Sequence, residues 1–152
     1  MSKFQRKFKM TVQGRSGNTH VITDPITVVF DISRRASGTA NSGHFMLYNL
    51  SASVRNDLQH DIVFDADQFK NFKFQAGYES EGWMPTLYKG TLQSAFSYRE
   101  GPDVITEIVV LDGGQAILEK QIESSRAFPW DAKTEMRGLV SLLGPYGVTL
   151  GA

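Results

Sequence analysis

Apolar and polar residues alternate with a period of two along much of the chain between Phe4 and Leu111. Phe8, Met10 and Val12 are separated by polar residues, which predicts a strand with one buried face. The same alternation predicts further strands at residues 20–23, 26–32, 45–50, 72–78, 87–98 and 104–111. Short Gly-containing turn clusters separate several of these strands and favour antiparallel hairpins.

A short helix is predicted directly after the strand at 45–50. Ser51 can accept a hydrogen bond from a first-turn N–H group, and Val54 and Leu58 lie four residues apart on one face. Two polar stretches on either side, at 34–43 and 61–69, have little to bury, and we expect both to be irregular.

The pattern changes after residue 114. Apolar residues then recur at helical spacing at Met136, Leu139, Val140 and Leu143. This spacing predicts an amphipathic helix over 133–143, with Asp131 as its N-cap and Gly144-Pro145 as its stop. Before it, residues 115–119 predict a helical turn and residues 122–127 a short strand.

These elements predict a mainly β fold of the β-rich α+β class. We expect an antiparallel β-barrel or sandwich with one short helix, followed by a C-terminal amphipathic helix. The 152 residues suffice for one domain with an appendage. We place the β domain at residues 1–114 and the C-terminal extension at 115–152.

The amino-acid composition excludes several classes of protein and of functional site. Sixteen Lys and Arg balance sixteen Asp and Glu, and this zero net charge argues against a coat for nucleic acid or for an anionic membrane. The absence of Cys excludes disulfides, thiolate zinc sites, iron–sulfur clusters and a Cys nucleophile. The apolar runs are far shorter than the roughly 20 residues that span a bilayer. Without a signal-peptide pattern either, we expect a soluble protein.

The His, Asp and Ser residues form no recognised metal-binding or catalytic motif. His20, His44 and His60 match no metal-ligand spacing, and we interpret each as a surface or turn histidine. The aspartates between residues 57 and 67 lack the Gly and Glu of an EF-hand loop, which favours a solvated acidic face. Neither a phosphate loop nor a nucleophile elbow is present. We therefore predict no enzyme, and no catalytic, cofactor-binding or metal-binding residues.

A series of short motifs occurs in a fixed order across residues 20–115. Asp-Ile-Ser-Arg ends the strand at 31–34, and Tyr-Asn-Leu-Ser follows at 48–51. The later motifs are Ala-Gly-Tyr-Glu at 76–79, Tyr-Lys-Gly-Thr-Leu at 88–92, Arg-Glu-Gly-Pro-Asp at 99–103 and Leu-Asp-Gly-Gly at 111–114. In this order they resemble the N-terminal tail-tube-like domain of bacteriophage tail hub and related baseplate proteins. The resemblance implies a tail-tube-like β-barrel or sandwich, and brings no catalytic residues.

The resemblance also implies a function in assembly. It implies a structural virion protein that forms a ring at the baseplate or hub end of the tail tube and connects the tube to the hub or spike. Its partners would be copies of itself, the tail tube, the hub or spike and the tape-measure protein, with neither a membrane span nor specific nucleic-acid binding. One tube-like domain per subunit would match a six-fold tube as a hexamer, which we favour over a trimer. The protein would be assembled in the host cytoplasm and reside in the virion tail.

Tail hubs usually continue into further domains after such a first domain, whereas this chain stops at Ala152. It is either a shorter single-domain relative or part of a longer chain. Two alternatives to the phage tail also remain open. One is a secretion-system tube or hub component of the same domain type. The other is a small carbohydrate-binding β module that would use Trp83 with Tyr78 and Tyr88.

The charges are divided unevenly along the chain. Residues 1–40 carry seven basic and two acidic residues, a balance of +5, so the rest of the chain carries −5. This division fits pairing of the basic end with the acidic segment of another copy, and it fits pairing of the two inside one domain equally well. The candidate interaction residues are Arg34, Arg35, Ser37, Gly38, Thr39 and Asn41 in the polar loop, and Asp57, Asp61 and Asp65 in the acidic segment.

Overall fold

A computed structural model of the chain describes residues 5–34, 40–61, 69–79, 82, 84–112 and 131–146. The chain divides into two compact units, residues 1–112 and 113–152. The first unit contains β1 (Arg6–Gln13), β2 (Thr19–Thr23), β3 (Val28–Ser33), β4 (Ser42–Tyr48), α1 (Ala52–Leu58), β5 (His60–Asp61), β6 (Lys70–Tyr78), β7 (Thr86–Glu100) and β8 (Asp103–Leu111). The second contains α3 (Ala132–Leu143) and the 3-10 helix η2 (Gly144–Tyr146). The prediction of a β-rich α+β fold is confirmed.

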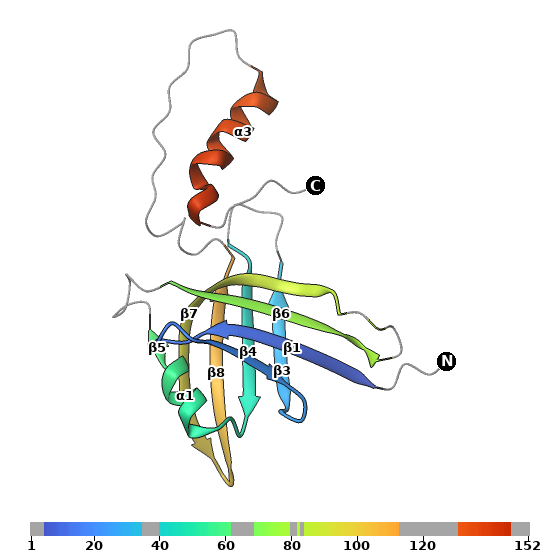
Figure 1. Ribbon diagram of the computed structural model, residues 1–152, viewed down its shortest axis with the longest axis vertical. Helices are drawn as coiled ribbons and strands as arrows, with labels where there is room; N and C mark the ends of the chain where they lie inside the picture. Colours follow the sequence, from blue (N-terminus) through green and yellow to red (C-terminus); the bar gives the residue numbers. More distant parts are fainter. Residues whose placement is uncertain are drawn as a thin grey trace. The chain divides into compact units, whose positions relative to one another are not determined.

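The strands of the first unit form one antiparallel sheet in the order β2-β1-β6-β7-β8-β4-β3, with β5 added beside β7. The sheet bends so that β1 and β6 run across β4 and β8 (Figure 1). In the described part of the chain β2 and β3 each pair on one side only, so the sheet is not closed. Of the two architectures expected, a barrel or a sandwich, the described residues therefore do not form the barrel. Instead, the ring of Phe30 in β3 packs against the ring of Phe74 in β6, with their centroids 4.8 Å apart. Side-chain packing between the two layers of the sheet therefore takes the place of a backbone hydrogen-bond ladder.

Strand β7 carries the bend, because it is long and contains a bulge. Its register against β8 shifts between Leu92 and Ser94, so Gln93 is an extra residue in the ladder. Leu92 is fully buried before the shift, and Ala95 is buried after it. The extra residue therefore reverses which positions of β7 face the core.

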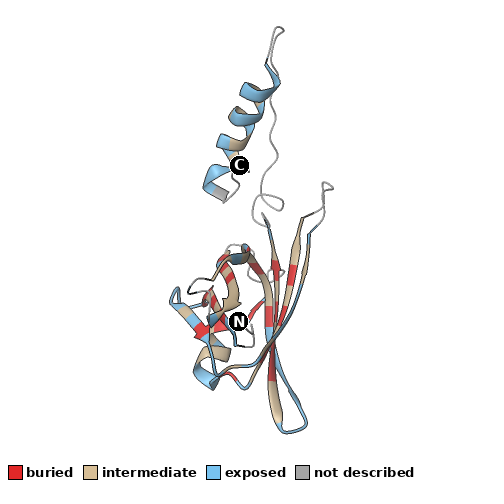
Figure 2. Cartoon of the chain, turned by 90° about the vertical axis from the view of Figure 1, so that its right-hand side faces the viewer, coloured by how far each residue is buried: buried red, intermediate tan, exposed pale blue. Residues whose placement is uncertain are grey.

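The core lies between the crossing layers (Figure 2). The predicted alternation of β1 is confirmed, since Phe8, Met10 and Val12 are all buried. Phe45 is fully buried at the centre, and its ring centroid lies 4.7 Å from that of Phe72. Aromatic rings in this offset and tilted arrangement add to the stabilisation from burial alone.

The short helix α1 begins as predicted. The Ser51 hydroxyl accepts a hydrogen bond from the Val54 N–H at 3.4 Å, and Leu58 is buried. Strand β4 ends at Tyr48, two residues earlier than predicted, because Asn49 has a left-handed φ of 58°.

Parts of the two stretches predicted to be irregular belong to strands. Ser42 and Gly43 lie in β4, and Asp61 lies in β5, because β8 and β7 offer free edges to pair with. The remaining residues of these stretches are largely outside the described residues. The predicted helical turn at 115–119 and strand at 122–127 also lie outside them.

Helix α3 confirms the predicted amphipathic helix and its cap. The Asp131 carboxylate accepts hydrogen bonds from the Thr134 N–H at 2.9 Å and the Thr134 hydroxyl at 2.7 Å. The α-helix ends at Leu143, before Gly144-Pro145 as predicted, and these two residues begin the 3-10 helix η2. None of the described helices is long and apolar enough to cross a lipid bilayer.

Candidate assembly surface

The Asp57 carboxylate at the end of α1 holds the turn between β1 and β2. It accepts hydrogen bonds from the Ser16 N–H and the Ser16 hydroxyl, both at 2.8 Å, and its Oδ2 lies 2.5 Å from His20 Nε2. The hydrogen bond to His20, followed by those to Ser16, lowers the pKa of Asp57 to about 2. A Cβ on Gly14 would lie 2.0 Å from the same carboxylate oxygen, so this contact requires a glycine. Asp57 therefore makes these contacts within its own subunit.

Ser16, His20 and Asp57 do not form a nucleophilic triad. In a triad the histidine lies between the serine and the carboxylate, where it takes the serine proton. Here the carboxylate lies in the middle and touches both partners. The described residues also contain no group of three His, Asp or Glu side chains that could hold a metal ion.

The other two histidines differ in their surroundings. His44 Nε2 lies 2.6 Å from Glu107 Oε1 on the outer side of the sheet. His60 is only 4% exposed and lies in a strand, so its interpretation as a surface or turn histidine was wrong. The reason is its place in β5, where it pairs with buried Ala95 of β7.

The ends of the predicted contact loop are anchored to the sheet. Arg34 Nη2 donates to the carbonyl of Leu87. The Asn41 carbonyl accepts from the Tyr88 hydroxyl at 2.7 Å and from the Asp112 N–H at 2.9 Å. Asp61 is exposed on β5, next to Ser94 of β7. Arg35, Ser37, Gly38, Thr39 and Asp65 lie outside the described residues.

Tyr88 belongs to the core and not to an exposed aromatic platform. It is 4% exposed, and burial raises its pKa to about 12. Tyr78 is partly buried on β6, and Trp83 lies outside the described residues. The three aromatic residues proposed for a carbohydrate surface therefore do not share one exposed face.

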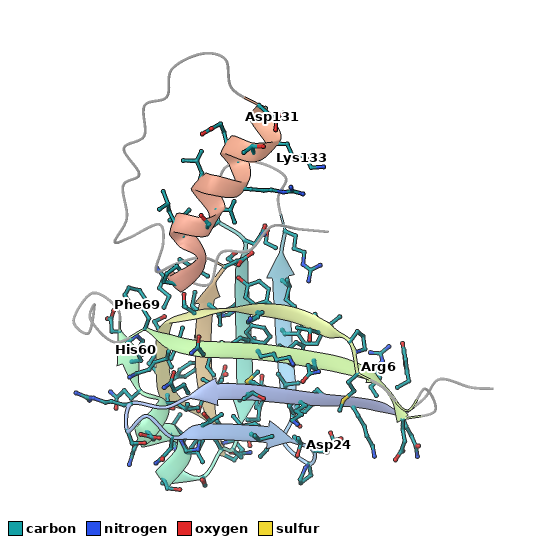
Figure 3. All side chains as sticks on the ribbon, turned by 45° about the horizontal axis from the view of Figure 1, so that its top comes forward. Arg6, Asp24, His60, Phe69, Asp131 and Lys133 are labelled. Atoms are coloured by element: carbon teal, nitrogen blue, oxygen red, sulfur yellow. The ribbon has the colours of Figure 1, made fainter. Side chains whose placement is uncertain are left out.

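A largely apolar cavity of about 650 Å³ opens where the sheet fails to close. It lies between the start of β1, the end of β6 and residues 24–30. Its apolar lining includes Phe8, Ile26, Val28, Phe30, Ala76 and Leu87, and Phe30 remains 44% exposed. Arg6 and Asp24 also line it, and Figure 3 shows both at the end of the sheet opposite His60.

An exposed aromatic pair lies near the turn between β7 and β8. Phe96 is 45% exposed and Tyr98 is 38% exposed, and their ring centroids are 6.1 Å apart. Desolvation, followed by the charges of Glu107 and Glu100, raises the pKa of Tyr98. Sequence reasoning missed this pair, since unbroken alternation would place both residues on the side of Leu92. The bulge at Gln93 turns them to the outer face.

Comparisons with known proteins give a likeness of structure and none of sequence. No family model and no curated protein matches the chain. Among solved structures, the chain is similar to a chain of the virion of a native gene transfer agent particle, with a TM-score of 0.49 and 12% sequence identity. The likeness covers 85% of this chain and 49% of that one, so the present chain spans about half the length of that protein.

Proposed function

We propose that this chain is a structural protein of a phage-type virion that acts by assembly. More specifically, it forms a ring at the baseplate or hub end of the tail tube and connects the tube to the hub or spike. We favour a ring of six copies over one of three. The single observation that carries the proposal is structural. The motifs that resemble the tail-hub domain contact one another and build the bent sheet.

The Tyr-Asn-Leu-Ser motif meets the Arg-Glu-Gly-Pro-Asp motif through Asn49. The Asn49 side-chain amide donates to Asp103 Oδ1 at 2.8 Å, and its carbonyl oxygen accepts from the Val104 N–H at 3.0 Å. The Asn49 N–H donates to the Val104 carbonyl at 2.8 Å. These bonds hold the left-handed residue that turns the chain from β4 toward α1. Two motifs that are far apart in sequence therefore stabilise the same turn of the chain.

The Tyr-Lys-Gly-Thr-Leu motif meets the Leu-Asp-Gly-Gly motif in the same way. The Tyr88 hydroxyl lies 3.3 Å from the Val110 carbonyl and can donate to it. Gly90 lies so close to Leu111 that a Cβ on it would be 2.5 Å from the Leu111 carbonyl oxygen. The motifs that carry the resemblance thus contain residues that hold the strands together. This is expected if the chain shares its fold and its role in assembly with tail-hub proteins.

The open sheet supports assembly as well. Within the described residues, β2 and β3 each leave one side without a ladder, and such edges can be covered by another chain. A ring joins two different faces of each subunit, and this unit offers distinct surfaces at its cavity and at its β7–β8 turn.

The test is to locate the protein in purified particles. Gold-labelled antibodies against the chain should mark the tail end of virions, and a nonsense mutation in its gene should give particles whose tubes are not joined to a hub. A plasmid copy of the gene should restore joined tails. Virions that lack the protein, or normal tails in the mutant, would show that the proposal is wrong. Recovery of the protein in secretion-system particles instead would favour that alternative.

A further inference from the structure

The aromatic pair on β7 is an apolar projection on a charged background. Phe96 and Tyr98 lie on one side of the strand, since they are two residues apart beyond the bulge. Arg99 and Glu100 follow at the end of β7, and Glu107 pairs with Phe96 across the ladder. Exposed aromatic residues ringed by charges are typical of the residues that dominate protein–protein binding.

The cavity is a concave apolar surface that complements this aromatic pair. Its volume of about 650 Å³ lies in the range of pockets that enclose an organic group, roughly 300–1,000 Å³. Its floor is aromatic, since the exposed ring of Phe30 packs on Phe74. Arg6 and Asp24 supply one charge of each sign among the lining residues, whereas the neighbouring Lys7 is paired with Glu79.

These two surfaces cannot meet within one copy. The β7–β8 turn extends away from the rest of the sheet, whereas the cavity lies by the start of β1 (Figures 1 and 2). Both belong to the first unit, whose strands are joined by continuous ladders. Any contact between them must therefore join two molecules.

We infer that Phe96 and Tyr98 of one copy insert into this cavity of the next copy. The charges fit such an occupant, because Glu100 can meet Arg6 while Arg99 meets Asp24. A projection that fits a pocket elsewhere on the same molecule gives a head-to-tail contact, which closes into a ring or extends as a filament. The inference rests on the proposed function, since it requires copies of the chain to assemble, and it names the residues that join them.

The first test removes the aromatic pair from the full chain. In the double variant Phe96→Ser/Tyr98→Ser, self-association measured by sedimentation velocity should weaken roughly tenfold or more. Thermal unfolding should change little, because both side chains are substantially exposed. The matched control is Val21→Ser, which alters an apolar residue that is 56% exposed on β2. Equal loss of association in the control, or no loss in the double variant, would overturn the inference.

The second test exchanges the charges. Arg6→Glu and Glu100→Arg should each weaken self-association, and the two substitutions combined should restore it. This design does not depend on the aromatic substitutions being tolerated. Two single losses without restoration in the combined variant would show that these residues do not face each other.

The third test identifies the site directly. A photoreactive benzoylphenylalanine at position 96 should cross-link to peptides from residues 24–30 or 76–78 of another copy, and the same group at position 21 should not. Oligomers that cross-link elsewhere would refute the inference and leave the proposed function intact. A chain that cross-links as expected but is absent from virions would refute the proposed function alone. A chain that stays monomeric, alone and with purified tails, would refute both.

Discussion

Gly90 leaves no room for a side chain where β7 passes the end of β8. A Cβ there would lie 2.5 Å from the carbonyl oxygen of Leu111 and 3.0 Å from its carbonyl carbon. Because both are backbone atoms, the contact cannot be relieved by a side-chain rotation. In Gly90→Ala the strands must move apart next to the Thr91–Leu111 pair.

The size of the effect follows from two costs. Overpacking costs about 1–3 kcal/mol, and a weakened ladder hydrogen bond adds about 1 kcal/mol. We therefore expect Gly90→Ala to lower the free energy of unfolding by about 2–4 kcal/mol. For a domain of this size the melting temperature should fall by roughly 10 °C.

Urea titration followed by circular dichroism measures this change. The control is Lys89→Ala, since Lys89 is the exposed neighbour on the opposite face of β7 and its loss should cost less than about 0.5 kcal/mol. If Gly90→Ala unfolds at the same urea concentration as this control, the close approach of β7 to Leu111 does not constrain the fold, and the reasoning fails.

Two further predictions concern the polar groups that hold the sheet. Tyr88→Phe should cost about 1–3 kcal/mol, because the buried hydroxyl lies within bonding distance of the carbonyls of Asn41 and Val110; Tyr98→Phe is the control and should change the unfolding free energy little. Since the pKa of Asp57 falls from 3.8 to about 2 on folding, its contribution is present above pH 4 and is lost as the pH falls toward 2. Asp57→Asn should thus flatten the dependence of melting temperature on pH between 5 and 2, and an unchanged slope would contradict the assignment.

Local signals predicted much of the fold correctly. The alternation of Phe8, Met10 and Val12 was enough to place β1, because one side of the strand is buried and the other is at least partly exposed to solvent. The caps of both helices were also predictable, since the Ser51 and Asp131 side chains bind N–H groups only three residues away.

Non-local contacts explain what the sequence did not reveal. Asp57 was interpreted as part of a solvated acidic face, yet its partners Ser16 and His20 lie 41 and 37 residues away along the chain. The failure of the sheet to close depends on how strands pair across the whole unit, and period-two alternation carries no information about it. The cavity and its lining residue Phe30 were missed for the same reason.

The bulge gives β7 one residue that its ladder with β8 does not use. Leu92 pairs with Val110 and Ser94 with Val109, so deleting Gln93 would leave these pairs in register and keep Phe96 and Tyr98 on the outer face. A loss of one residue would thus straighten the strand without burying the aromatic pair. Among relatives of this chain, subunits with and without that single residue should therefore both display the pair and differ in the bend of β7.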